Sequence, residues 1–327
     1  MPLPELVPFF MELAGIPSPP GEERAVADRV VHYIRELGLQ VDEDAAGAQI
    51  GSTMGNLLAR AEPTDGNGGT PIFLCAHLDT VLPTDEIEPV LDDGVITNAR
   101  NTILGADNKA AVVVMLEAVR RIREERLPHA GIELLFTPKE ETGVEGAKAF
   151  DVERLAARVG FVFDHAGPIG EVVTAAPSST SIDATFKGRA AHAGMHPEEG
   201  RSAIFAAARA IADLRLGRVD AETTANVGEI AGGTARNIIP DRCVVVAEAR
   251  SQDDRKLRDL VQEMVDSMTF AASLAECELE LELEEKYSGY RFRADDPPVR
   301  LAFEALAATG FEPRGIVAGG GADANAF

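Results

Sequence analysis

One histidine and five acidic residues stand at turns and at the ends of predicted buried strands, an order that suits a metal site. His77 and Asp79 lie two residues apart, directly after the apolar run 71–76. On an extended backbone their side chains point to the same face, and an imidazole beside a carboxylate that fixes its tautomer is a common pairing at metal centres. His-x-Asp alone is weak evidence, because a hydrogen-bonded histidine at a strand end is the commoner explanation.

The other acidic residues of this set are, in chain order, Asp107, Glu140, Glu141 and Asp164. Asp107 lies in a turn into a predicted helix, and the other three follow the buried runs 132–136 and 161–163. Individually they have ordinary explanations as a helix cap, a solvated pair and a strand-end cap. Together they are harder to explain in that way, because ligands bind at the carboxyl ends of the strands in open parallel sheets.

This set of side chains indicates metal-assisted hydrolysis. One imidazole with several carboxylates suits zinc, manganese or cobalt better than calcium or magnesium. A carboxylate that bridges two metals, together with a free glutamate beside a ligand glutamate, completes the set. Two ions about 4 Å apart hold and acidify a water, and the free carboxylate takes its proton.

The elements that would position these residues alternate between strand and helix. Helical spacing covers 3–13 and 22–37, and a proline- and glycine-rich stretch between them breaks the helix. A further helix is expected at 107–123, with strands at 39–42, 56–59, 71–76, 132–136 and 161–163. This alternation predicts an α/β domain with a mainly parallel sheet that is covered on both faces.

The pattern changes after about Glu171, which predicts a second, inserted domain. The order strand, helix, strand, strand, helix, strand predicts a ferredoxin-like α+β arrangement, with two helices on one face of an antiparallel sheet. Its last strand, 278–284, alternates glutamate with leucine, so we expect one solvent face and one apolar face. The expected boundaries are a first domain of 1–171 plus 289–327 and an inserted domain of 172–288.

The composition is that of an ordinary globular protein with a strong acidic excess. A chain of 327 residues favours two domains. Its 54 acidic and 31 basic residues give a net charge of −23 and leave no basic footprint for nucleic acid. The apolar runs are too short for a membrane span. Three scattered cysteines, without a signal-peptide pattern, predict a cytoplasmic protein.

Several motifs resemble those of the di-zinc exopeptidase superfamily, which includes peptidase T, carboxypeptidase G, succinyl-diaminopimelate desuccinylase and aminoacylase. The metal-side motifs are 75–81, 105–109, 140–143 and Asp164, and the substrate-side motifs are 192–194, 232–240, 248–250 and 319–325. They occur in the family's order over the whole chain, and the branch that they resemble most is that of the peptidase T-like proteins. The resemblance implies a metal-binding domain with an inserted dimerisation, or lid, domain.

The resemblance also implies how two divalent cations would be held, with zinc expected first and cobalt or manganese as alternatives. His77 and Asp164 would bind one ion, Glu141 would bind the second, and Asp107 would bridge both. In the family the peptide bond after the bridging aspartate is cis, so we expect a cis bond between Asp107 and Asn108.

The remaining implied roles concern catalysis and substrate. Asp79 would orient the zinc-binding histidine, and Glu140 would be the general base that takes a proton from the attacking water and later protonates the leaving amine. His192 would reach the partner's site in a homodimer and stabilise the oxyanion. Asn237 and Arg250 would bind substrate, Arg250 through a carboxylate.

One ligand of the family's second zinc site has no counterpart in the sequence. The family uses a histidine well downstream of the glycine-rich loop, and no histidine follows His196 here. We expect residues beyond Phe327 to supply it; the alternative is a natural chain that lacks this ligand.

The predicted function is hydrolysis of an amide bond in a small peptide, in the manner of a tripeptide aminopeptidase. One alternative is a deacylase of N-acyl amino acids within the same superfamily. Another is a non-catalytic dimeric relative, which the missing histidine would explain. The sequence does not choose between the substrates, because specificity depends on the shape of loops.

Overall fold

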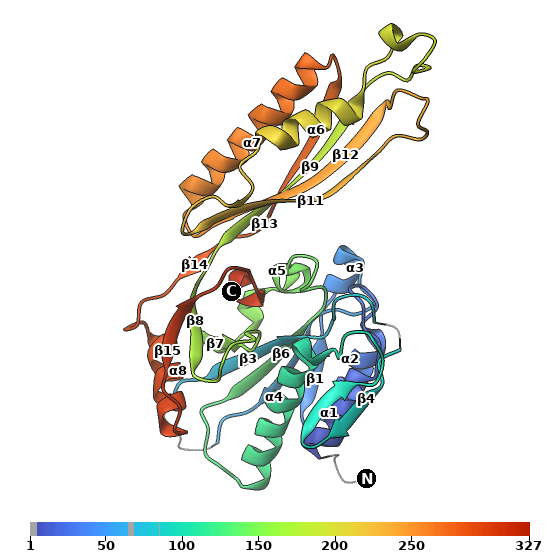
Figure 1. Ribbon diagram of the computed structural model, residues 1–327. Helices are drawn as coiled ribbons and strands as arrows, with labels where there is room; N and C mark the ends of the chain where they lie inside the picture. The colour runs from blue at the N-terminus through green and yellow to red at the C-terminus, as the bar shows by residue number, and fades with distance from the viewer. Residues whose placement is uncertain (1–4, 65–68, 85) are drawn as a thin grey trace. The chain divides into compact units, whose positions relative to one another are not determined.

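The computed structural model describes residues 5–64, 69–84 and 86–327. They form two compact units (Figure 1), the first within Met1–Val173, Arg293–Ile316 and Ala322–Phe327, and the second within Thr174–Phe292 and Val317–Gly321. The second unit is therefore an insertion in the first. Residues 317–321, which we expected in the first domain, group with the second unit.

The first unit contains a five-stranded sheet, a hairpin and the helices that surround them. Its helices are α1 (Leu6–Ala14), α2 (Arg24–Glu36), α3 (Ala46–Ile50), α4 (Ala106–Glu124), α5 (Glu145–Ala149), η1 (Val152–Arg154), α8 (Pro297–Ala308) and η3 (Asp323–Ala326). Its strands are β1 (Gln40–Glu43), β2 (Leu57–Ala61), β3 (Ile72–His77), β4 (Pro89–Asp92), β5 (Val95–Asn98), β6 (Ile132–Thr137) and β7 (Val159–Val162).

The five-stranded sheet has the order β1-β2-β6-β3-β7 and is mixed rather than mainly parallel. Strand β3 pairs in parallel with β6 and β7, whereas β2 runs antiparallel to both β1 and β6. The α/β class is confirmed. The parallel prediction holds for the three strands that precede the candidate ligands, because helix α4 provides the long crossover that parallel pairing requires between β3 and β6.

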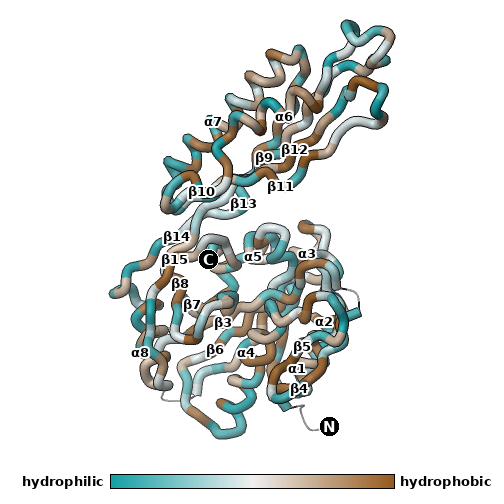
Figure 2. The backbone as a smooth tube through the Cα atoms, viewed as in Figure 1, coloured by the Kyte–Doolittle hydropathy of each residue, from teal (hydrophilic) through white to brown (hydrophobic). Residues whose placement is uncertain are grey.

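Both faces of this sheet are covered by apolar side chains, as the sequence predicts. Helices α1, α2 and α4 pack on one face, where Leu134 and Phe136 of β6 join their core. Leu135, between them, belongs to a second cluster with Phe73 and Cys75. Figure 2 shows hydrophobic residues concentrated around β3 and α4. The strands are thus fixed on both sides, which gives the residues at their ends a rigid support.

The inserted unit has the predicted ferredoxin-like arrangement. Its elements are β9 (Ser178–Lys187), η2 (Pro197–Glu199), α6 (Ala203–Asp213), β10 (Gly217–Arg218), β11 (Thr223–Gly232), β12 (Arg242–Ser251), α7 (Asp254–Leu274) and β13 (Glu278–Tyr287). The antiparallel sheet has the order β10-β11-β12-β9-β13, and α6 and α7 cover one face (Figure 1). Leu279 and Leu281 of β13 pack against that core, while Glu278, Glu280 and Glu282, which alternate with them, are exposed.

A third sheet joins segments that are distant in the sequence. It has the order β14-β8-β15, formed by β8 (Glu171–Ala176), β14 (Tyr290–Arg291) and β15 (Arg314–Val317). Within the described ranges, no helix has the length and apolar character that crossing a membrane requires.

Candidate metal centre

The parallel strands bring the candidate residues to one edge of the sheet. His77 is the last residue of β3 and lies opposite Thr137, the last residue of β6. Glu140 and Glu141 follow β6 after a short turn, and Asp164 comes two residues after β7. Side chains that are up to 87 positions apart in the sequence therefore meet because their strands end together.

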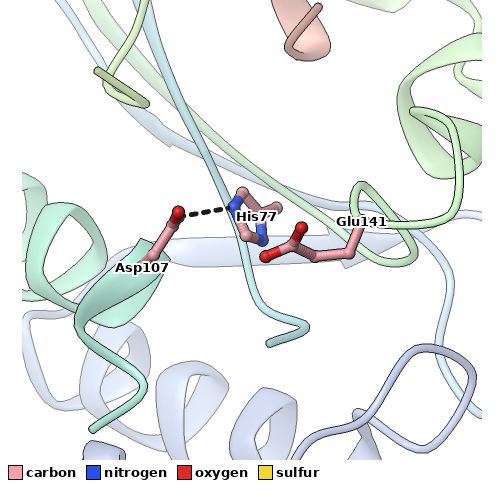
Figure 3. A group of neighbouring side chains, drawn as sticks. All are labelled: His77, Asp107 and Glu141. Atoms are coloured by element: carbon pink, nitrogen blue, oxygen red, sulfur yellow. Dashed lines mark hydrogen bonds and ion pairs between the residues drawn. The ribbon is translucent and has the colours of Figure 1, made fainter. Parts of the chain in front are cut away.

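All four predicted metal ligands lie close together, and the predicted base lies with them. The ligand atoms of His77, Asp107 and Glu141 lie within 4.8 Å of one another, and so do those of His77, Glu140 and Asp164. Figure 3 shows the imidazole of His77 between the carboxylates of Asp107 and Glu141. The distance from His77 Nε2 is 3.1 Å to Asp107 Oδ1 and 3.7 Å to Asp164 Oδ1.

The hydrogen bond at Nδ1 fixes the tautomer of a neutral His77. Nδ1 lies 2.9 Å from the backbone carbonyl oxygen of Asp79, and a carbonyl oxygen only accepts, so Nδ1 carries the proton. Nε2 is then the nitrogen with a free lone pair, and it is the one that faces Asp107 and Asp164. The imidazole is almost fully buried, with 2% of its side-chain surface exposed. This is the arrangement that a metal-binding histidine needs.

Asp79 does more than the sequence predicts. Its carboxylate oxygen is 3.4 Å from His77 Nδ1, farther than its own backbone oxygen. The two carboxylate oxygens instead accept the backbone N–H groups of Glu140 and Glu141, at 2.9 and 3.0 Å. Through these two hydrogen bonds Asp79, which is fully buried, connects the end of β3 to the loop after β6. Sequence patterns do not reveal this contact, because its donors belong to the backbone.

Asp107 lies at the start of α4, where the backbone departs from helical geometry. The peptide bond between Asp107 and Asn108 is cis, as expected. Both residues have non-helical backbone angles, and Gly105 before them has a positive φ of 73°. Glycine adopts that conformation without a steric penalty. The helix thus begins with an irregular turn that presents Asp107 to His77.

The pKa values of the cluster reflect acidic groups that lie close together and are, except for the exposed Asp107, partly buried. Burial lowers the pKa of His77, but hydrogen bonds to three aspartates outweigh that effect and raise it well above the usual value. Burial is the main reason that the pKa of Glu140 rises to about 9 and that the pKa values of Glu141 and Asp164 rise. In its protonated form, which carries a proton on Nε2 as well, His77 donates a hydrogen bond to Asp107 and lowers the pKa of that carboxyl group. Carboxylates packed in this way are stabilised by a nearby positive charge.

One buried acid beside the cluster was not assigned by the sequence. Asp323, at the start of η3, accepts a short hydrogen bond from the hydroxyl of Thr137, and its Oδ2 lies 3.8 Å from the sulfur of Cys75. Burial raises the pKa of Asp323 to about 6. The glycine-rich motif at 319–325 was its only signal, and the resemblance assigned that motif to the substrate side.

The three predicted substrate-binding residues belong to the inserted unit. An isolated bridge joins His192 to Ile238, and the backbone N–H of Ala193 donates to the carbonyl oxygen of Asn237 at 3.0 Å, so the two motifs are neighbours. Arg250 donates to Glu248 at 2.8 Å, and its buried Nε has no hydrogen-bond partner among the described residues. Their roles toward a substrate stay predictions.

Comparisons with known proteins agree with this geometry. A family model of the peptidase dimerisation domain matches residues 174–273, and one of peptidase family M28 matches residues 56–203. Aminopeptidase PepT from Bacillus cereus is 40% identical, with a TM-score of 0.85, and a tripeptidase from Staphylococcus aureus is 36% identical, with a TM-score of 0.90. Each alignment covers 98% of this chain and 86% of the other. The chain belongs to the peptidase T family of metallopeptidases.

Two further proteins are similar to this chain in sequence. An uncharacterised Bacillus subtilis protein is 37% identical over 320 residues, which cover 98% of this chain and 86% of that protein. A peptidase T from Vibrio parahaemolyticus is 29% identical over 224 residues, which cover 67% of this chain and 54% of that enzyme. This peptidase T-like chain is thus a metal-dependent hydrolase with a dimerisation domain inserted in its α/β domain.

Proposed function

We propose that this protein is an aminopeptidase that hydrolyses tripeptides or similarly small peptides at a site for two divalent cations. The observation that carries the proposal is the pair of ligand groups that share His77 at the edge of the sheet. The similarity to a solved aminopeptidase and a solved tripeptidase supports the substrate class. The cytoplasmic location stays a prediction from cysteine usage.

The donor set fits divalent cations of the zinc type. It offers the lone pair of one buried imidazole nitrogen and the oxygens of carboxylates, which are the ligands that zinc accepts, with cobalt and manganese as alternatives. We assign His77 and Asp164 to one ion, Glu141 to the second and Asp107 to both. His77 is the member common to both geometric groups, so the bridging role of Asp107 rests on the resemblance and on its position beside Nε2.

Glu140 is the residue that we assign to proton transfer. When bound, the two cations would polarise the scissile carbonyl group and acidify the attacking water. Glu140 would take the proton from that water and pass it to the leaving amine. Its backbone N–H donates to the carboxylate of Asp79 at 2.9 Å, which fixes the loop from which its side chain reaches the site. Asp79 would hold the base and the imidazole in register.

Substrate binding and assembly complete the proposal. We infer a homodimer through the inserted unit, whose residues 174–273 match the peptidase dimerisation domain. His192 would serve the partner's site and stabilise the oxyanion, and Asn237 and Arg250 would hold the substrate. The partly buried guanidinium of Arg250, whose Nε has no hydrogen-bond partner in the described part of the chain, suits a carboxylate at the end of a short peptide.

The test is a substrate screen of the full-length protein after reconstitution with zinc, cobalt or manganese. Dipeptides, tripeptides and N-acyl amino acids are assayed in parallel, and metal content is measured on the same samples. We expect two metal equivalents and the highest kcat/KM on tripeptides. Faster cleavage of N-acyl amino acids would support the deacylase alternative. This chain is also 33% identical over 188 residues to an indole-3-acetyl-aspartic acid hydrolase from Enterobacter agglomerans. Absence of both metal and turnover would support the non-catalytic alternative.

A further inference from the structure

The loop that carries Glu140 and Glu141 is held by backbone hydrogen bonds to two different buried carboxylates. The N–H groups of Glu140 and Glu141 donate to Asp79. The N–H of the preceding residue, Lys139, donates to Oε1 of Glu23 at 3.2 Å. Three consecutive amides are therefore fixed from two separate segments, one at the end of β3 and one at the start of α2. Glu23, the second of these carboxylates, is neither a ligand nor the base in the proposed mechanism.

The carboxylate of Glu23 has unusual surroundings for a charged group. It has no exposed surface, and its hydrogen bonds come from neutral groups: Oε1 also accepts the N–H of Gly21 at 2.6 Å, and Oε2 accepts the hydroxyl of Ser52 at 2.7 Å. Burial is the main cause of the raised pKa of Glu23. A buried acid costs stability unless its hydrogen bonds compensate, and an apolar residue would fill the same space without that cost. The hydrogen bonds that Glu23 accepts therefore indicate why a carboxylate is present at this position.

Lys139, the partner in the loop, has a backbone conformation that needs support. Its φ is +54°, in the left-handed region, where a residue other than glycine is strained. Its Nζ donates to the carbonyl oxygen of Ile50 at 2.7 Å and to Glu145 at 2.9 Å. The side chain and the backbone of Lys139 are thus both fixed, and this turn determines the direction in which Glu140 leaves β6.

We propose that Glu23 is a positioning residue of the peptidase site, which fixes the backbone at Lys139 and so directs Glu140 and Glu141 toward the cations. The inference rests on the proposed function of those two glutamates. Glu23 and Asp79 then act as a pair, each holding one end of the same three-residue segment. Without Glu23, the N–H of Lys139 and the strained turn lose their support, and the segment would shift relative to His77.

The test uses the full-length protein with glutamate 23 replaced in two ways. Glu23→Ala removes every acceptor, whereas Glu23→Gln keeps an oxygen for Lys139 and places an amide where the oxygen of Ser52 can accept. Cobalt affinity is measured by chelator competition, followed through the visible absorption of bound cobalt, and kcat and KM are measured on a tripeptide. We expect Glu23→Ala to weaken cobalt binding and to lower kcat by about tenfold each, with KM nearly unchanged. Glu23→Gln should restore most of both.

Asp44→Ala is the matched control. In the described part of the chain, the carboxylate of Asp44 also accepts backbone N–H groups, those of Ala46 and Asn56 at 3.0 and 2.8 Å, but outside the catalytic loop. It should lower the melting temperature and leave cobalt affinity unchanged. If Glu23→Ala and wild type have equal cobalt affinity and equal kcat, the positioning role of Glu23 is wrong, while the proposed function still stands. A wild-type protein that binds no cobalt would overturn the proposed function and the inference with it.

Discussion

Acidic residues occupy two regions of this molecule under opposite conditions. At the edge of β3, β6 and β7 they lie close to one another and are mostly removed from solvent. Asp79 has no exposed surface, Glu140, Glu141 and Asp164 are partly buried, and Asp107 is the exposed member. Along β13 they are spaced by leucines and lie in solvent, as Glu280 and Glu282 show. A carboxylate in water keeps its hydration, whereas a buried one needs hydrogen bonds or a cation. The net charge of the chain therefore says little about where its chemistry lies.

The comparison predicts its largest effect at Glu140. Replacing its carboxylate with an amide, Glu140→Gln, removes the proton acceptor but keeps the shape, and we expect kcat to fall by about 100- to 10,000-fold. Metal content should stay at the wild-type value, because Glu140 is assigned as the base. The measurements are steady-state kinetics and metal analysis, with Glu282→Gln as a matched control in solvent. A near-normal rate would refute the base assignment, and loss of one metal equivalent would make Glu140 a ligand.

Metal removal should destabilise the first of these regions and leave the second unchanged. Because the ions bind only the folded site, a metal concentration about 1,000 times the Kd adds about 4 kcal/mol of stability. Chelation should therefore lower the melting temperature and increase hydrogen exchange at 77–79 and 139–141, while β13 keeps its protection. Calorimetry and hydrogen exchange on the same samples check both statements. Exchange that rises equally in both units would show that the ions stabilise more than the site.

The third prediction concerns Asp323 and the pH dependence of the free energy of unfolding. Its pKa rises from 3.8 to about 6 on burial, so its neutral form favours folding. The contribution is fully present below the unfolded pKa and is lost as pH rises through about 6. Two pKa units correspond to about 3 kcal/mol. In metal-free protein, Asp323→Asn should therefore gain about that much stability relative to wild type between acidic and neutral pH.

The measurement for Asp323 is the difference in unfolding free energy between variant and wild type, from urea titrations at several pH values. Taking the difference removes the titration of other groups that both proteins share. The amide can still accept the hydroxyl of Thr137, so this contact is kept. A difference that does not change with pH would mean that the pKa of Asp323 is not raised by folding.

The sequence reveals features whose physical cause is local. His77 and the acids after it could be assigned because each follows an apolar run, and the ferredoxin-like order follows from periodicity and turns. The hairpin of β4 and β5 was missed although its signal is local, since Asp93 and Gly94 both have positive φ and Asp-Gly favours such a turn. The contacts of Asp323 and Glu23 could not be predicted. They join segments 186 and 116 residues apart, and periodicity carries no information on such pairings.

The smallest expected effect, with the opposite sign, is on β13. Glu282 is exposed and lies directly opposite Asp183 of β9, and like charges at such positions repel one another. Glu282→Gln should therefore stabilise the protein by a few tenths of a kcal/mol and leave turnover unchanged. Thermal unfolding at low salt checks the gain, which should shrink as salt screens the repulsion. A loss of stability would mean that the acidic face of β13 has a partner, and the contrast between the two regions would then fail.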